Sequence, residues 1–256
     1  MIHPTAVISE SATIGDNVAI GPFAVIGDNV EIGDGTRIDS HVVVNGATVI
    51  GRDNRIHQFA SVGDDPQDKK YAGEPTRLEI GDRNTIHQFV TISRGTTQDK
   101  GVTIIGDDNW IMAYVHIAHD CVIGSNTIMA NGATLAGHVH VGDWAIFGGK
   151  TGVHQFCRVG AHAFIGMYCG LNRDVPAYTM VSGTPAVPKG INSEGLKRRD
   201  FSSEQIRNIK NAYRLVYRKG LKLNEAIAEL EGLVGERPEL NVFLDSLRSS
   251  ERGIVR

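Results

Sequence analysis

An apolar and almost always aliphatic residue recurs at every sixth position through the first two thirds of the chain. The series runs without a failure over residues 2–62, resumes over 80–92 and runs again over 105–171. A helix needs apolar residues at 3.6-residue spacing and a half-buried strand needs alternation, so a strict period of six fits neither. The period predicts a short strand followed by a turn, with one aliphatic side chain per strand pointing inward.

Glycine often follows the aliphatic position, and Asp or Asn often follows the glycine, as turns favour. Three strand–turn units would close a triangular coil of eighteen residues, and successive coils would stack at about 4.8 Å. The expected fold is an all-β parallel β-helix. Because such a three-sided prism is solid, any chemistry must lie on its outside.

Two segments break the six-residue register, residues 64–77 and residues 95–103. The first is charged and contains Pro and Gly, and the second inserts a net single residue. We expect both to be loops that project from the prism. Ordered loops on a rigid scaffold are common places for binding residues.

The repeat fades after residue 171, and residues 174–190 are expected to form a last, irregular coil. We therefore predict a β-helix domain over 1–190 and a helical domain over 191–256. Ser202 and Gln205 have the spacing of a capping box that opens a helix ending before Gly220. Asn224 and Pro238 are expected to open two further helices.

Composition limits the function classes. Aromatic residues make up 6% of the chain and glycines number 30, which suits a narrow core. A net charge of −3 does not suggest a nucleic-acid partner. No stretch approaches the roughly 20 apolar residues that span a bilayer, and the N-terminus lacks the pattern of a secretion signal. The three cysteines include no CxxC pair, which favours reduced thiols in a cytoplasmic protein.

The eighteen-residue coil gives a test for the ten histidines. Residues eighteen apart lie one above the other, so Gly137 stacks on His119, and Gln155 stacks on Gly137. His138 and His154 lie beside this line on the next two coils. Three histidines are therefore expected along one edge of the prism, with His116 in the same turn region as His119.

Three interpretations of this edge remain open at this point. The polar turn positions carry histidine by accident, or neutral imidazoles share a zinc ion, or one imidazole acts as a general base. We favour general-base catalysis, with Asp120 orienting His119. Gly137 then offers a backbone N–H to stabilise an oxyanion. No resident metal or cofactor is expected.

Longer strings carry a resemblance to a known family. The repeat itself resembles the hexapeptide-repeat proteins, whose β-helix is left-handed, and this implies the hand of the coil. The strings QDKKYAGEPTR (67–77), HIAHD (116–120), NGATLAGHV (131–139), VHQFC (153–157) and NSEGLKRR (192–199) occur in the order seen in UDP-N-acetylglucosamine O-acyltransferases. The resemblance covers essentially the whole chain.

The resemblance implies the first acyl transfer of lipid A biosynthesis, from acyl carrier protein to the sugar 3-hydroxyl. His119 would be the general base, Asp120 its orienter and the Gly137 N–H the oxyanion donor. The acyl donor rides on the phosphopantetheine of the carrier protein, so no acyl-enzyme is implied. The substrate-binding residues implied are Asp68, Lys70, His116, His138, His154, Gln155, Asn192, Glu194, Arg198 and Arg199. The resemblance also implies a homotrimer with active sites between subunits.

A basic stripe lies beside the apolar face of the predicted helix after Ser202. It consists of Arg207, Lys210, Arg214 and Arg218, at spacings of 3, 4 and 4. Such a stripe can be a solvated helix face. It also suits an acidic partner, because opposite charge steers association. We expect it to bind the acyl carrier protein.

Two residues depart from the pattern seen in other members. Ser93, in TISRG, stands where a second basic residue is common, which leaves open a 3-hydroxyl or a 3-amino acceptor sugar. Met167, in GMYCG, stands where members that accept long acyl chains have glycine. We expect Met167 to select a shorter chain, 3-hydroxydecanoyl-like rather than 3-hydroxymyristoyl-like, although methionine also fills gaps well.

Other functions of β-helix proteins fit less well. A hexapeptide-repeat carbonic anhydrase would need a wider histidine pair than HIAHD provides. Acetyltransferases that use coenzyme A lack this combination of motifs. The related N-acyltransferase carries an extra domain before its repeat, and ice-binding β-helices need flat arrays of threonine.

Overall fold

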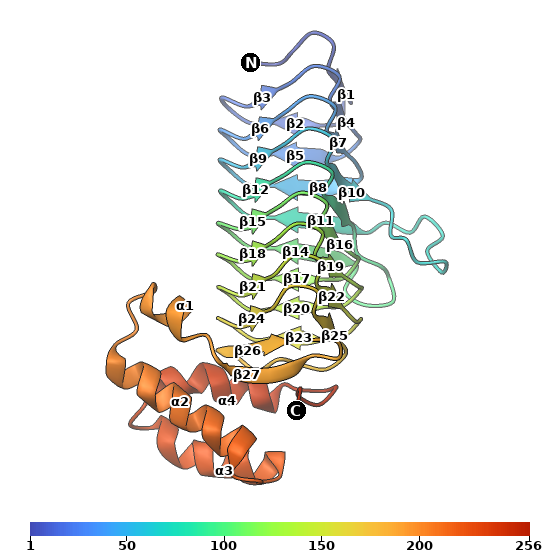
Figure 1. Cartoon of the computed structure of the whole chain (residues 1–256). Coiled ribbons are helices and arrows are strands. Elements are labelled where there is room, and N and C mark those ends of the chain that lie inside the picture. Colours follow the sequence, from blue (N-terminus) through green and yellow to red (C-terminus); the bar gives the residue numbers. More distant parts are fainter.

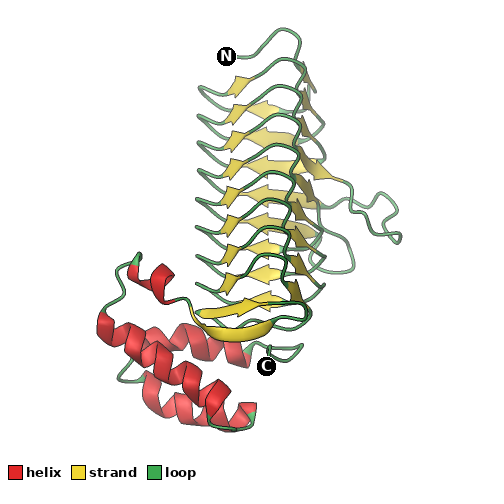
Figure 2. Ribbon diagram, in the orientation of Figure 1, coloured by secondary structure: helices red, strands yellow, loops and turns green.

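The computed structural model describes residues 1–256 as a tall three-sided prism with a group of helices at its C-terminal end (Figure 1). The chain winds as a left-handed parallel β-helix, in which three short strands and three turns make one coil. Figure 2 shows that strands build the whole prism and that the helices follow it. The prediction of the fold class is confirmed.

Each face of the prism is one sheet. The first face consists of β1 (Val7–Ile8), β4 (Val25–Ile26), β7 (Val43–Val44), β10 (Ser61–Asp64), β13 (Thr91–Ser93), β16 (His116–Ile117), β19 (Thr134–Leu135), β22 (Gly152–Val153) and β25 (Gly170–Leu171). The second consists of β2 (Thr13–Ile14), β5 (Val30–Ile32), β8 (Ala47–Ile50), β11 (Arg77–Ile80), β14 (Val102–Ile105), β17 (Val122–Ile123), β20 (His140–Val141) and β23 (Arg158–Val159). The third consists of β3 (Ala19–Ile20), β6 (Arg37–Ile38), β9 (Arg55–Ile56), β12 (Thr85–Ile86), β15 (Trp110–Ile111), β18 (Ile128–Met129), β21 (Ile146–Phe147), β24 (Phe164–Ile165), β26 (Thr179–Ser182) and β27 (Val187–Ile191).

Turns between the faces form three edges, which we name by order along the chain. The first edge joins the first face to the second, the second edge joins the second face to the third, and the third edge returns to the first face. Strand pairing fixes the coil length, since Ile117 pairs with Leu135 and Leu135 pairs with Val153. Each step is eighteen residues, as the periodicity predicts.

The core is a column of the six-residue aliphatic side chains. It contains 42 buried residues, and more than half of them occupy the six-residue positions of the repeat. Along the second edge, a buried ladder of side chains runs beside it. Asn54 Oδ1 accepts the backbone N–H of Asn84, whose Oδ1 accepts that of Asn109, whose Oδ1 accepts that of Thr127. These amides satisfy the backbone groups that the turns leave inside the prism.

Both interruptions of the repeat leave the prism at the first edge. One loop spans residues 65–76, between β10 and β11, and the other spans 94–101, between β13 and β14. Both interruptions are loops in the structure. Both loops are shorter than predicted, because the flanking strands extend into the predicted ranges at Asp64, Arg77, Val102 and Thr103.

The C-terminal part differs in detail from expectation. The last coil closes with β27 antiparallel to β26, whereas the repeat gave no sign of a reversal. A short helix that was not predicted, α1 (Ser193–Lys197), follows it. The capping box of Ser202 and Gln205 is confirmed at the start of α2 (Ser203–Arg218).

The last two predicted helix starts are partly wrong. The helix α3 (Leu223–Val234) begins one residue before Asn224. Pro238 opens only the 3₁₀ turn η1 (Pro238–Leu240), and α4 (Asn241–Arg248) follows it. These helices share a second core of 16 buried residues with Tyr178 of the last coil. None of the helices has the length and apolarity to cross a membrane.

Candidate active site

Two vertical columns meet at the first edge, in the turns after β16, β19 and β22. One column contains His119 and Gly137, and the other contains Asp120, His138 and Phe156. Backbone hydrogen bonds tie the turns together, from the His138 N–H to the His119 carbonyl at 3.0 Å and from the Phe156 N–H to the Gly137 carbonyl at 3.1 Å. Sequence spacing therefore does place His119, Gly137 and His138 together.

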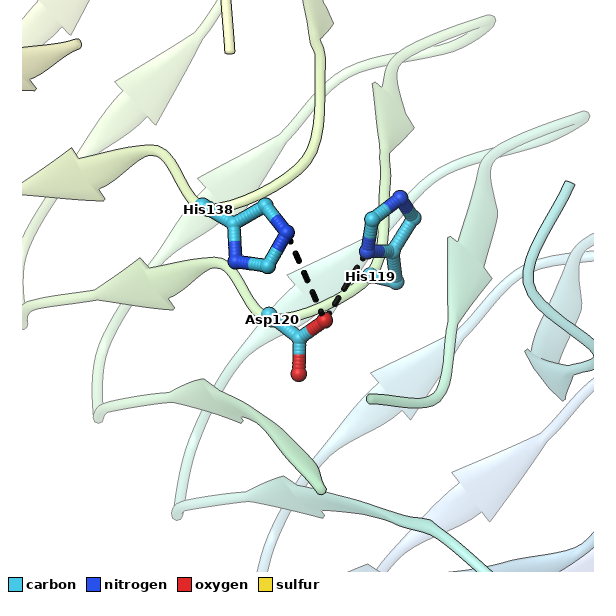
Figure 3. Close-up of side chains that lie close together, drawn as sticks. All are labelled: His119, Asp120 and His138. Atoms are coloured by element: carbon cyan, nitrogen blue, oxygen red, sulfur yellow. Dashed lines mark hydrogen bonds and ion pairs between the residues drawn. The ribbon is translucent and has the colours of Figure 1, made fainter. Parts of the chain in front are cut away.

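His119 and Asp120 form a hydrogen-bonded pair (Figure 3). The Nδ1 of His119 lies 2.9 Å from Oδ2 of Asp120, and the two side chains are 15% and 1% exposed. An ionised carboxylate only accepts hydrogen bonds, so Nδ1 carries the proton. The Nε2 of His119 then has a free lone pair, as a general base requires.

Asp120 is held as an anion by its neighbours. Thr96 donates two hydrogen bonds to it, from its backbone N–H to Oδ1 at 2.9 Å and from its hydroxyl to Oδ2 at 2.6 Å. Burial by itself raises the pKa of Asp120, but the hydrogen bonds from His119 and Thr96 outweigh it, so the pKa lies below its usual value. Asp120 therefore stays ionised beside His119.

His138 is the second imidazole of the site. Its Nδ1 lies 2.9 Å from Oδ2 of Asp99, on the 94–101 loop, and its Nε2 lies 3.9 Å from Oδ2 of Asp120. The His138 ring meets the His119 ring edge to face at 5.0 Å, and the Phe156 ring stacks on its other side at 4.4 Å. His138 is thus fixed by two carboxylates and by two rings.

Gly137 lies directly against the free side of His119. A Cβ placed on it would stand 2.5 Å from Cε1 and 2.7 Å from Nε2 of His119, so only glycine allows this approach. Its backbone N–H donates no hydrogen bond within the chain. An unpaired, buried N–H beside a histidine Nε2 is the arrangement expected of an oxyanion donor.

The same side chains are the ones best placed to hold a metal ion. Ligand atoms of His119, Asp120 and His138 all lie within 4.8 Å of one another (Figure 3). However, both Asp120 oxygens already accept hydrogen bonds from Thr96. A metal would have to displace these bonds or the bond to His119.

The remaining histidines of this edge differ from one another. His116 lies on strand β16 of the first face, rather than in the turn that contains His119 as expected, and its Nδ1 is 2.7 Å from the Thr91 hydroxyl. Burial, and then the charge of His119, lower the pKa of His116 and favour its neutral form. His154 and Gln155 are exposed. The His154 Nδ1 lies 3.1 Å from the Gln155 carbonyl oxygen, and the ring that stacks on His138 is that of Phe156.

Asp68 and Lys70 lie on the 65–76 loop. The Asp68 carboxylate accepts the Lys70 N–H at 3.0 Å and forms a turn, and the Lys70 side chain is exposed. Sequence reasoning missed Thr96, Asp99 and Phe156. The eighteen-residue count from His138 identifies Phe156, but no count reaches the loop residues.

Comparison with known proteins bears on this site. A family model described as UDP N-acetylglucosamine O-acyltransferase, domain 2, matches residues 174–255, and the bacterial transferase hexapeptide model matches residues 103–137. The chain is 57% identical to the acyl-[acyl-carrier-protein]–UDP-N-acetylglucosamine O-acyltransferase of Janthinobacterium sp. (strain Marseille), covering 100% of this chain and 99% of that one. It is 56% identical to the protein of the same name from Thiobacillus denitrificans, with the same coverage.

The chain belongs to the UDP-N-acetylglucosamine O-acyltransferase family. It is accordingly an acyltransferase. Solved structures of the family have the same fold throughout. Those from Moraxella catarrhalis and Acinetobacter baumannii match with TM-scores of 0.99 and 0.98, at 49% and 48% identity, each covering 100% of this chain and 99% of the other.

A second group of predicted site residues of this O-acyltransferase lies at the second edge. The Asn192 side chain caps α1 and donates to the His162 carbonyl at 3.0 Å. The guanidinium of Arg199 lies 4.8 Å from the centre of the Trp144 ring. Glu194 pairs with Lys197, and Arg198 is exposed. No contact joins this group to His119 within one chain, because the two groups lie on different edges.

The last predicted residues of the O-acyltransferase are exposed. Met167 lies on the third edge, in the turn after β24, with 67% of its surface exposed. Between it and His119, the outward positions of the first face are Thr134, Gly152 and Gly170. The space outside Gly152 is open, whereas Thr184 packs close to Gly170. On α2, Arg207, Lys210, Arg214 and Arg218 are all exposed, and none of them forms a salt bridge.

Proposed function

We propose that this chain transfers an (R)-3-hydroxyacyl group from acyl carrier protein to the 3-hydroxyl of UDP-N-acetylglucosamine, the first step of lipid A biosynthesis. The observation that carries the proposal is the His119–Asp120 pair facing the free N–H of Gly137. The names of the relatives supply both substrates. The proposal needs no resident cofactor, because the acyl group arrives on the phosphopantetheine of the carrier protein.

The geometry supports direct transfer. Nε2 of His119 takes the proton from the sugar 3-hydroxyl as the hydroxyl oxygen attacks the thioester carbonyl. The oxygen of the resulting tetrahedral intermediate accepts the Gly137 N–H. Collapse of this intermediate expels the phosphopantetheine thiolate, which recovers the proton from His119. Asp120 stabilises the imidazolium that forms between these two steps.

The acyl groove, in this proposal, follows the first face from His119 toward Met167. The open space outside Gly152 would hold part of a hydrocarbon chain, and Met167 would close the far end. A methionine there shortens the groove and favours a 3-hydroxydecanoyl-like donor. His138, His154 and Gln155 would contact the sugar and the start of the acyl chain.

The nucleotide side of the site would come from a second copy, in a homotrimer. Two observations support this. Asn192, Glu194, Arg198 and Arg199 lie on a different edge from His119. The third face also turns apolar side chains outward that a neighbouring copy would cover. Trp110 is exposed, and Ile128, Ile146 and Phe164 are half-buried.

The carrier protein would dock on the unpaired cations of α2, Arg207, Lys210, Arg214 and Arg218. Asp68 and Lys70 would contact the nucleotide sugar. We assign the chain to the cytoplasm, because its three cysteines, Cys121, Cys157 and Cys169, are all free and buried. Burial also raises the pKa of the Cys121 thiol to about 12, which argues against a thiolate nucleophile.

The proposal is tested by assaying His119→Ala with UDP-N-acetylglucosamine and a panel of 3-hydroxyacyl carrier proteins. We expect acyl transfer to fall by about a thousandfold or more, while circular dichroism and oligomer mass stay unchanged. A variant that keeps substantial turnover would contradict the general-base assignment. The UDP-3-amino sugar, tested as a second acceptor, establishes whether the acceptor group is oxygen or nitrogen.

A further inference from the structure

The 94–101 loop reaches over the turn that carries the catalytic pair. Thr96 is 1% exposed and supplies both the N–H and the O–H that Asp120 accepts. The loop folds tightly there, since the N–H groups of Asp99 and Gly101 both bond to the Thr96 carbonyl. Gly95 is required at the start, because a Cβ on it would lie 2.1 Å from the backbone nitrogen of Val102.

Arg94, at the root of this loop, fastens it to the 65–76 loop. Its N–H bonds to the Asp64 carbonyl at 3.0 Å and its Nη1 to the Gly63 carbonyl at 2.6 Å. Its Nη2 donates to the Tyr71 hydroxyl at 3.0 Å and pairs with Asp65. With only 11% of the Arg94 side chain exposed, both loops share one nearly buried cation.

Hydrogen bonds therefore join Tyr71 to Arg94 at one end, and Thr96 to Asp120 and His119 at the other. Only Gly95 separates Arg94 from Thr96, so the backbone connects the two sets. We propose that Arg94 and Thr96 are positioning residues that couple the 65–76 loop to the catalytic pair. Through them, a substrate held by the 65–76 loop steadies Asp120 and hence the direction in which His119 Nε2 points. This inference rests on the proposed function, since it assigns a task to His119 and to that loop.

Positioning predicts an effect on turnover more than on binding. Thr96→Val keeps the shape of the side chain and removes only the hydroxyl donor, so Asp120 can shift while the substrates still bind. We expect kcat to fall about tenfold to a hundredfold with both KM values within about twofold. Thr96→Ser keeps the hydroxyl and should retain most of the wild-type kcat. Thr97→Val, the same change at the next, exposed residue, is the matched control.

The coupling is tested with Tyr71→Phe, which removes the hydroxyl that Arg94 contacts. Alone it should lower kcat several-fold. If the two loops act as one unit, the kcat of the double variant Tyr71→Phe/Thr96→Val should be little lower than that of Thr96→Val. If the two residues act independently, the two reductions in kcat should multiply. Multiplying effects, or an unchanged kcat in Thr96→Val, would overturn the inference.

Melting temperatures of all the variants establish that each one is folded. The His119→Ala assay separates this inference from the proposed function. An inactive His119→Ala enzyme together with a fully active Thr96→Val enzyme removes only the positioning role. An active His119→Ala enzyme removes the proposed function itself.

Discussion

A methyl group on Gly137 would lie 2.5 Å from Cε1 of His119, closer than non-bonded carbon atoms approach one another in proteins. Gly137→Ala must therefore push the imidazole away from the site. We expect kcat to fall about a hundredfold, because a displacement of about 1 Å has that effect on a reacting group. Steady-state kinetics measure it. Gly232→Ala, in α3 with no atom nearby, is the control and should leave kcat unchanged. Normal turnover in Gly137→Ala would mean that His119 need not lie where it does.

The stability of the helical end should fall in mild acid because of His162. Burial, and then Arg199, lower the pKa of His162 to about 4. The unfolded chain takes up the proton near pH 6.5, whereas the folded chain takes it up only near pH 4. Protons therefore favour unfolding as the pH falls from 6.5 to 4, and the melting temperature should drop across that window.

The partners of His162 give this prediction a control. Arginine only donates, so the His162 Nδ1, which lies 3.4 Å from Arg199 Nη1, must be unprotonated. Asp143, also nearby, acts in the opposite direction. His162→Gln cannot titrate and should show a smaller change in melting temperature between pH 6.5 and 4. An equal change in both proteins would show that other groups are responsible.

The preference for the length of the donor's acyl chain should depend on Met167. Replacing this exposed side chain by glycine lengthens the proposed groove without disturbing the core. We expect Met167→Gly to gain at least about tenfold in kcat/KM for 3-hydroxymyristoyl carrier protein relative to 3-hydroxydecanoyl carrier protein, since each added methylene buried contributes about 0.8 kcal/mol. Met112→Gly, on the same edge nearer the N-terminus, is the comparison. An unchanged preference in Met167→Gly would remove the ruler role.

Charge reversal on α2 should weaken the binding of the acyl carrier protein and no other step. We expect Arg214→Glu to raise the KM for acyl carrier protein about tenfold at low salt and less at high salt, because salt screens exposed charges. The KM for UDP-N-acetylglucosamine and the kcat should stay near wild type. Arg52→Glu reverses an exposed charge near the other end of the prism and should change neither KM. Equal effects of the two variants would point to net charge rather than to docking.

The sequence predicts the prism and half of the site for one physical reason. Strand pairing repeats every eighteen residues, so a count along the chain is also a measure of height. That count relates His119 to Gly137 and Asp120 to His138. The same count leads from His138 to Phe156, which is why Phe156 and not His154 stacks on His138.

The features that the sequence does not predict lie outside the repeat, where the eighteen-residue count no longer applies. Thr96 and Asp99 belong to a loop outside the repeat, so nothing in the spacing relates them to Asp120 or His138. The helix α1 has five residues, too few for a helical period to show. The reversal at β27 follows from the turn geometry of 183–186 rather than from any pattern of apolar residues.

That reversal has a consequence for assembly. A parallel β-helix has no natural length, because each coil offers the next the same row of backbone donors and acceptors. A stack that ended on such a row would be a growing polymer end, ready to add another chain. By running β27 against the direction of the coils and covering it with helices, the chain terminates its own propagation at that end (Figure 1). The C-terminal region therefore also prevents end-to-end polymerisation of the β-helix at that end.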